Sequence, residues 1–153
     1  MTLDEVAARE CIRQTINTYT VSGDCRDDEL FCAQFTEDAT LEFAGFESLA
    51  SFKHVGLDTI RRMRALWSKP LVDDPDASRQ SIVRHDLTTS YIDLTGKGTA
   101  TAKTYFVAST ESGIDHAGVY SDRLVQSGDR WLLAYRTIRL DWRSVESVAS
   151  AKR

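Results

Sequence analysis

The second half of the chain is patterned as four consecutive β-strands, and this run constrains the fold more than any other feature. From Ile82 onward, β-branched and aromatic residues are interrupted by three glycine-containing turns, at residues 96–98, 111–113 and 127–129. Short glycine turns between such runs are typical of β-hairpins. The pattern therefore predicts an antiparallel meander of four long strands, which we expect to twist strongly and to curve.

The first half of the chain is patterned mainly as helices. Thr2-Leu-Asp-Glu5 has the form of a capping box, and apolar residues then recur at helical spacing as far as Tyr19. Gly23 follows, and because glycine accepts the left-handed conformation it predicts the end of this helix. A second, short helix is expected from about Asp27, and a third after Gly56.

Helices followed by a meander indicate an α+β domain. Residues 36–39 are interpreted as a turn, and the stretches 40–43 and 51–54 as short strands. The length of 153 residues suits one domain over residues 1–153. Pro and Asp residues predict a loop at 69–81, either a lid or simple disorder. Residues 144–153 are interpreted as a C-terminal tail.

Composition excludes several classes of function. The net charge is −4, and Lys and Arg form no dense stripe, so no nucleic-acid partner is expected. No leader peptide and no apolar run long enough to cross a membrane is present, so we expect a cytoplasmic protein. The three cysteines have no metal-like spacing to histidines. No metal and no cofactor are therefore expected.

Two polar residues that lie far apart in the sequence are the first candidates for a catalytic site. Asp24 follows the expected end of the first helix, and His85 opens the first long strand. A carboxylate that orients an imidazole makes a general base near neutral pH. The residues alone leave alternatives open, because a histidine at a strand start is usually structural and an Asp near a helix start is often a cap.

The chain resembles the SnoaL-like branch of the NTF2-like superfamily. The resemblance rests on the order of the elements and on four phrases, Asp24-Cys-Arg-Asp-Asp-Glu-Leu-Phe, Phe35-Thr-Glu-Asp-Ala-Thr, Gly118-Val-Tyr-Ser-Asp-Arg-Leu and Gly128-Asp-Arg-Trp-Leu-Leu. It implies a cone in which N-terminal helices pack inside a strongly curved sheet. Because this fold hosts lyases, isomerases, cyclases and binding modules, the resemblance indicates the fold more than the reaction.

The resemblance also implies roles for single residues. The cofactor-free lyases of this family use a His–Asp dyad, and His85 and Asp24 stand at the matching places. The bile-acid dehydratases place a Tyr five residues before that Asp, which matches Tyr19 and implies a catalytic donor, although Tyr19 also lies on the apolar stripe of its helix. They add an Arg on the last strand, and Arg139 matches it if the alignment is shifted by one residue. Because a shift of one residue turns a side chain to the other face of a strand, Arg136 is the alternative.

Further substrate-binding candidates come from the third long strand of the predicted meander. Asp115 falls where the bile-acid dehydratases tend to have an amide side chain, and His116 is the candidate for the second pocket histidine of scytalone-type dehydratases. Tyr120 is the best placed of the strand tyrosines to act as a pocket donor, although core packing is the default for each of them.

Three functions remain open at this point. The first is a cofactor-independent, dehydratase-like lyase that acts on a hydrophobic small molecule. The second is an isomerase or cyclase of polyketide or terpenoid type that uses the same base, and the third is a non-catalytic module that binds a small molecule or a partner. Because both faces of the predicted sheet carry apolar residues, we also expect a homodimer or a higher assembly through the sheet face.

Overall fold

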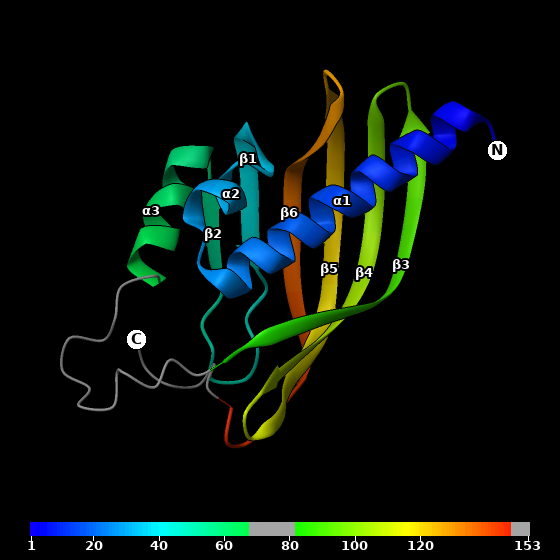
Figure 1. Cartoon of the computed structure of the whole chain (residues 1–153). Helices are drawn as coiled ribbons and strands as arrows, with labels where there is room; N and C mark the ends of the chain where they lie inside the picture. The colour runs from blue at the N-terminus through cyan, green and yellow to red at the C-terminus, as the bar shows by residue number, and fades with distance from the viewer. Residues whose placement is uncertain (68–81, 148–153) are drawn as a thin grey trace.

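The computed structural model describes residues 1–67 and 82–147 of the chain. The predicted loop at 69–81 and residues 148–153 of the predicted tail lie outside this description. Three helices, α1 (Leu3–Cys25), α2 (Asp28–Cys32) and α3 (Leu57–Trp67), accompany a six-stranded sheet. The expected α+β class is therefore confirmed, and Figure 1 shows α1 lying diagonally across one face of the sheet.

The start of α1 is the predicted capping box. The Thr2 hydroxyl accepts a hydrogen bond from the Glu5 backbone N–H at 3.2 Å, and the Glu5 carboxylate accepts one from the Thr2 N–H at 2.8 Å. The predicted end at Gly23 is wrong by two residues. The helix continues to Cys25, and Arg26, with φ 58°, takes the left-handed position that a glycine usually occupies.

The sheet contains β1 (Phe35–Phe43), β2 (Phe52–Val55), β3 (Arg84–Gly96), β4 (Thr99–Thr110), β5 (Gly113–Ser127) and β6 (Arg130–Arg143). Its strand order is β2-β1-β6-β5-β4-β3, and the last four strands form the predicted antiparallel meander. The β1 strand pairs in parallel with β6. The turn expected at residues 36–39 is wrong, because β1 already begins at Phe35 and its register to β6 shifts between Phe35 and Thr40.

The concave face of the sheet and the helices share one hydrophobic core. On β4, the buried residues Ala102, Thr104 and Phe106 alternate with the exposed residues Lys103 and Tyr105. The buried set faces α1, because one face of a half-buried strand turns towards the core. A cone lined by the inner side chains of β3 to β6 results, as expected.

A close approach of strands explains one glycine on this inner face. A Cβ atom at Gly118 would collide with the carbonyl oxygen of Arg139 and would come within 2.9 Å of the Phe106 ring. The glycine therefore allows Phe106 to lie against Tyr120, with ring centroids 4.4 Å apart.

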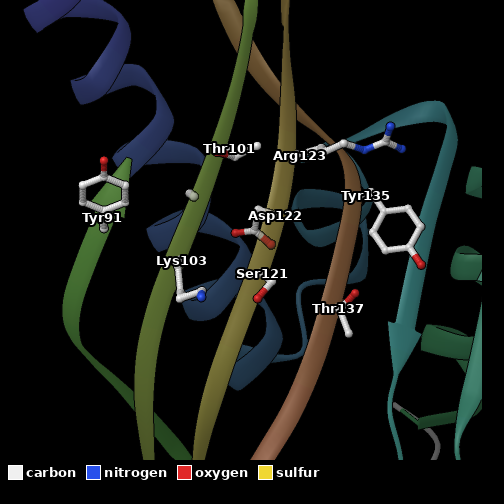
Figure 2. A pocket seen from close by; sticks show the side chains of 9 residues that line it. Tyr91, Thr101, Lys103, Ser121, Asp122, Arg123, Tyr135 and Thr137 are labelled. Atoms are coloured by element: carbon white, nitrogen blue, oxygen red, sulfur yellow. The ribbon is translucent and has the colours of Figure 1, made fainter. Parts of the chain in front are cut away.

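The outer face of the sheet is hollowed. A shallow groove of about 670 Å³ crosses β3 to β6. Figure 2 shows side chains from all four strands around it, including Tyr91, Lys103, Ser121 and Tyr135. No helix among the described residues has the length and apolar character needed to cross a membrane.

Candidate functional site

The contact between Asp24 and His85 joins the last turn of α1 to the start of β3. His85 Nδ1 lies 2.6 Å from Asp24 Oδ1, and the His85 backbone N–H donates to Asp24 Oδ2 at 2.9 Å. The Asp24 side chain is 8% exposed and that of His85 is 24% exposed. Because a carboxylate only accepts hydrogen bonds, Nδ1 is the donor of this contact, and in the neutral imidazole Nε2 is then the nitrogen that carries a lone pair.

Local structure explains why Asp24 is available for this contact. Asp27 caps α2 by accepting a hydrogen bond from the Leu30 backbone N–H at 2.9 Å. The extra two residues of α1 place Asp24 inside the helix, two residues before the left-handed cap at Arg26. Asp24 therefore faces β3 instead of serving as a cap.

A second His–Asp pair lies beside the first. His116 Nδ1 is 2.7 Å from Asp115 Oδ2, and the Ser147 hydroxyl donates to the same oxygen at 2.5 Å. The imidazole rings of His116 and His85 are 5.5 Å apart, with the Phe106 ring within 6 Å of each. Burial is the main cause that lowers the pKa of His116, so the neutral imidazole is favoured near neutral pH.

Asp115 occupies a different position from the one expected. Its side chain is only 3% exposed and lies behind His116, where it holds the ring and meets Ser147. It is therefore placed to orient His116, whose own side chain is 12% exposed. Residues 144–147, at the start of the predicted tail, contribute to this arrangement, because the Ser144 backbone N–H donates to the Asp115 carbonyl at 2.7 Å.

Two tyrosines lie deeper in the cone. The rings of Tyr19 and Tyr120 meet edge to face at 5.8 Å, and Tyr120 stacks on Phe106. Burial raises the pKa of Tyr19 and raises that of Tyr120 well above its ordinary value. Both phenols therefore keep their protons at physiological pH, which is the state a hydrogen-bond donor to a developing oxyanion needs.

The expectation for Arg139 is corrected by the structure. Arg139 lies opposite Val119 on the outer face, its side chain is 61% exposed, and it pairs with Asp141 at 2.8 Å. The alternative, Arg136, is fully buried on the inner face. Side chains alternate between the two faces of a strand, and Arg136 and Arg139 are three positions apart, so Arg139 is separated from the dyad by the sheet itself.

Arg136 forms a buried ion pair that the sequence analysis did not identify. Its Nε and Nη2 atoms each donate to Asp122 at 2.7 Å, and both side chains are 0% exposed. The guanidinium lies 4.0 Å from the Tyr19 ring centre and 4.3 Å from that of Tyr120. Burial acts to lower the pKa of Arg136, but Asp122 raises it and the net pKa stays above the ordinary value. Arg136 is therefore a permanent cation that holds the two tyrosine rings.

The structure thus brings together most of the predicted site residues: Asp24, His85, Tyr19, Tyr120, His116 and, behind it, Asp115. Across residues 1–67 and 82–147, no group of three or more His, Cys, Asp or Glu side chains is arranged to hold a metal ion.

Comparison with known proteins agrees with this architecture. The model of the SnoaL-like domain matches residues 4–137, most of the chain. The chain belongs to the SnoaL-like domain family. A search of curated proteins gave no match.

Solved structures share the fold of this SnoaL-like domain at low sequence identity. A protein from Novosphingobium aromaticivorans DSM 12444, provisionally named a scytalone dehydratase, is 18% identical with a TM-score of 0.72, over 94% of this chain and 91% of that one. An NTF2-like protein with a cystatin-like fold from Novosphingobium aromaticivorans is 20% identical with a TM-score of 0.71, over 99% and 93%. A Catenulispora acidiphila protein in complex with S-DNPA is 20% identical with a TM-score of 0.68, over 89% and 95%. The chain therefore has the NTF2-like, cystatin-like fold.

Proposed function

We propose that this SnoaL-like domain is a cofactor-independent lyase of dehydratase type that acts on a hydrophobic small molecule. The observation that carries the proposal is the 2.6 Å contact between His85 Nδ1 and Asp24 Oδ1, made in a partly buried setting beside the Phe106 ring. The provisional scytalone dehydratase and the small-molecule complex among the similar structures support the choice of chemistry and of ligand type.

The residues have distinct roles in the proposed reaction. His85 Nε2 removes a proton from a carbon next to a carbonyl, and Asp24 stabilises the imidazolium that forms. The broken C–H bond supplies the electrons of the new double bond as the C–O bond to the leaving hydroxyl breaks. His85 then returns its proton to that oxygen, so water leaves and the histidine is neutral again. A positioned general base of this kind typically contributes about 10²–10⁴ in rate.

The remaining side chains stabilise and orient the substrate. The phenols of Tyr19 and Tyr120 donate to the oxygen on which negative charge develops, and one such donor is typically worth roughly 10²–10³ in rate. Neutral His116, with Nδ1 turned to Asp115, presents Nε2 as an acceptor for a substrate hydroxyl. An isomerase or cyclase would use the same base. Release of water or halide supports the lyase, and an unchanged product mass supports the isomerase.

An NMR titration of the three histidines tests the dyad directly. Because the Asp24 carboxylate lies 2.6 Å from Nδ1 of His85, the ring resonances of His85 are expected to respond differently to pH in Asp24→Asn. The measurement follows the histidine ring resonances from about pH 4 to about pH 9, a range that spans the ordinary histidine pKa.

His54 provides the internal control for this titration. It lies on β2 against Phe52, with ring centroids 5.2 Å apart, and no contact with Asp24 is recorded for it in the described part of the chain. Its titration should not change in Asp24→Asn. A His85 that titrates like a free imidazole and ignores the substitution contradicts the proposal and favours a binding module.

We also propose that two copies pair through the outer face of the sheet. Tyr105 and Trp142 lie on this face and are 49% and 48% exposed, and exposed apolar patches of this kind mark interfaces.

The wild-type protein is expected to have the mass of a dimer by light scattering after size-exclusion chromatography. The variant Tyr105→Asp is expected to shift this mass towards that of the monomer. Val6→Asp, at an exposed position on α1, is the matched control. A wild-type monomer at all concentrations contradicts this proposal.

A further inference from the structure

A cavity lies between α1 and β3, and it is lined by residues of both elements and by Thr104 of β4. Its volume is about 310 Å³. The two elements are joined at both ends of this space, by Asp24 and His85 at one end and by Arg9, whose guanidinium donates to the Ile92 carbonyl, at the other. Figure 1 shows that β3 bends along its length where it passes α1.

A break in the strand register coincides with the bend. The pairing of β3 with β4 shifts between Leu87 and Ser90, so residues 88 and 89 have no regular partner. Such bulges bend a strand and increase its local twist. The bulge therefore separates β3 from α1 at the point where the cavity opens.

The lining of this cavity is rich in hydrogen-bond donors. The helix contributes Arg13 and Asn17, and the strands contribute the hydroxyls of Thr88, Ser90 and Thr104. The Ser90 and Thr104 hydroxyls lie 3.1 Å apart, which joins β3 to β4 beside the bulge. None of the described residues that line the cavity is acidic.

Charge at the rim favours an anionic group. Arg13 forms an ion pair with Glu10 at 3.3 Å, with side chains that are 49% and 71% exposed. An exposed pair of this kind is weak, so a ligand carboxylate can compete for the guanidinium. A carboxylate accepts hydrogen bonds from a guanidinium, an amide and hydroxyls, all of which this lining supplies.

The cavity and the dyad lie along the same two elements, α1 and β3. On α1, Arg13, Asn17 and Asp24 lie on one stripe, because spacings of four and seven residues return to the same side of a helix. Seven residues at 1.5 Å each place Asn17 about 10 Å from Asp24 along the axis. On β3, Leu87 lines the cavity and lies two residues from His85, on the same face of the strand.

We propose that this cavity is the subsite for a carboxylate at the far end of the substrate. This proposal adds a class of substrate to the proposed lyase function, and it rests on that function. The substrate is then an elongated hydrophobic acid, with its reacting carbon at His85 and its carboxylate about 10 Å away, among Arg13, Asn17 and the strand hydroxyls.

Binding of two matched probes tests the subsite without any need for turnover. The probes are 4-(1-naphthyl)butanoate and 4-(1-naphthyl)butan-1-ol, which share an apolar ring system and differ in the charged end. Equilibrium dialysis with naphthalene fluorescence gives both dissociation constants. The acid is expected to bind about tenfold more tightly than the alcohol, because one additional charge-assisted hydrogen bond changes the dissociation constant by about this factor.

Variants of α1 assign that preference to the cavity. Arg13→Gln and Asn17→Ala are each expected to weaken binding of the acid several-fold, on the order of the loss of one hydrogen bond, and to leave the alcohol unaffected. Gln14→Ala, at an exposed position next to Arg13 on the same helix, is the matched control. All three positions are exposed, so these variants are expected to fold normally, as circular dichroism would show.

The possible outcomes separate this proposal from the proposed function. Acid binding that depends on Arg13 and persists in His85→Gln supports the subsite, whatever the titration of His85 shows. Equal binding of acid and alcohol, equal effects of Arg13→Gln and Gln14→Ala, or no binding of the acid to the wild-type protein overturns the subsite. A normal titration of His85 overturns the lyase instead.

Discussion

Replacing His85 by Gln is expected to lower turnover by about 10²–10⁴, the usual worth of a positioned general base. Glutamine keeps the side chain polar and of similar size, but it has no lone pair that accepts a proton near neutral pH. Asp24→Asn is expected to lower turnover as well, because the amide presents a donor to His85 and removes the charge that stabilises the imidazolium. The loss should appear in kcat, since the proton is transferred only in the transition state.

The measurement requires a substrate, and the site defines the search. Hydrophobic hydroxyketones and halogenated analogues, with and without a carboxylate at the far end, are incubated with the protein and followed for release of water or halide. His54→Gln is the matched control, because it removes an imidazole outside the dyad. Turnover of His85→Gln within about threefold of wild type would contradict the assignment of His85 as the base.

Removing Asp122 is expected to produce the largest loss of stability. Asp122→Ala leaves the Arg136 guanidinium buried, at 0% exposure, without its two 2.7 Å hydrogen bonds. Loss of one partner from a buried pair typically costs about 3–5 kcal/mol in the free energy of unfolding. Urea denaturation of the wild type and the variant gives the difference.

Two further variants make this prediction specific. Asp141→Ala removes the partner of Arg139 in an ion pair whose side chains are at least half exposed, and it should cost about 1 kcal/mol or less. The double variant Asp122→Leu with Arg136→Met removes both buried charges, and it should recover much of the loss. If Asp122→Ala is no more destabilised than Asp141→Ala, the buried pair does not contribute as described.

The ion pair also links stability to the site. Arg136 touches the rings of Tyr19 and Tyr120, and Tyr120 stacks on the Phe106 ring that both site histidines approach. A change that moves the guanidinium therefore also moves the side chains around the dyad, although Arg136 itself has no exposed surface. This is the reason to test the dyad by substitutions at Asp24 and His85 and not at Arg136.

Local signals in the sequence predicted the elements well. The three glycine turns of the meander and the capping box of α1 depend on nearest neighbours and on a few residues of spacing, and the structure confirms them. The end of α1 was missed because Arg26 adopts a left-handed conformation that is typical of glycine. Residues 36–39 were missed because they lie inside β1, at the point where its register to β6 shifts, and an irregularity of this kind has the local composition of a turn.

The faces of the last two strands could not be predicted by counting from their turn. Ser127 pairs with Arg130, and regular pairing from there would place Asp122 opposite Tyr135. A register shift between Arg123 and Leu124 places it opposite Arg136 instead. A slip of one residue reverses the face of every later side chain, and the position of a bulge is not written in a local pattern.

The sequence by itself determined the α+β class, the meander and the identity of the polar residues available for chemistry, because turns, caps and periodicity are local properties of the chain. Only the tertiary structure decided which of those residues meet. Asp24 and His85 lie 61 residues apart, and their contact depends on where α1 ends and how β3 bends. Arg136 faces the interior, opposite Asp122, because β6 has one extra residue where the register shifts between Arg123 and Leu124, and a pairing between distant strands decides where such a shift falls.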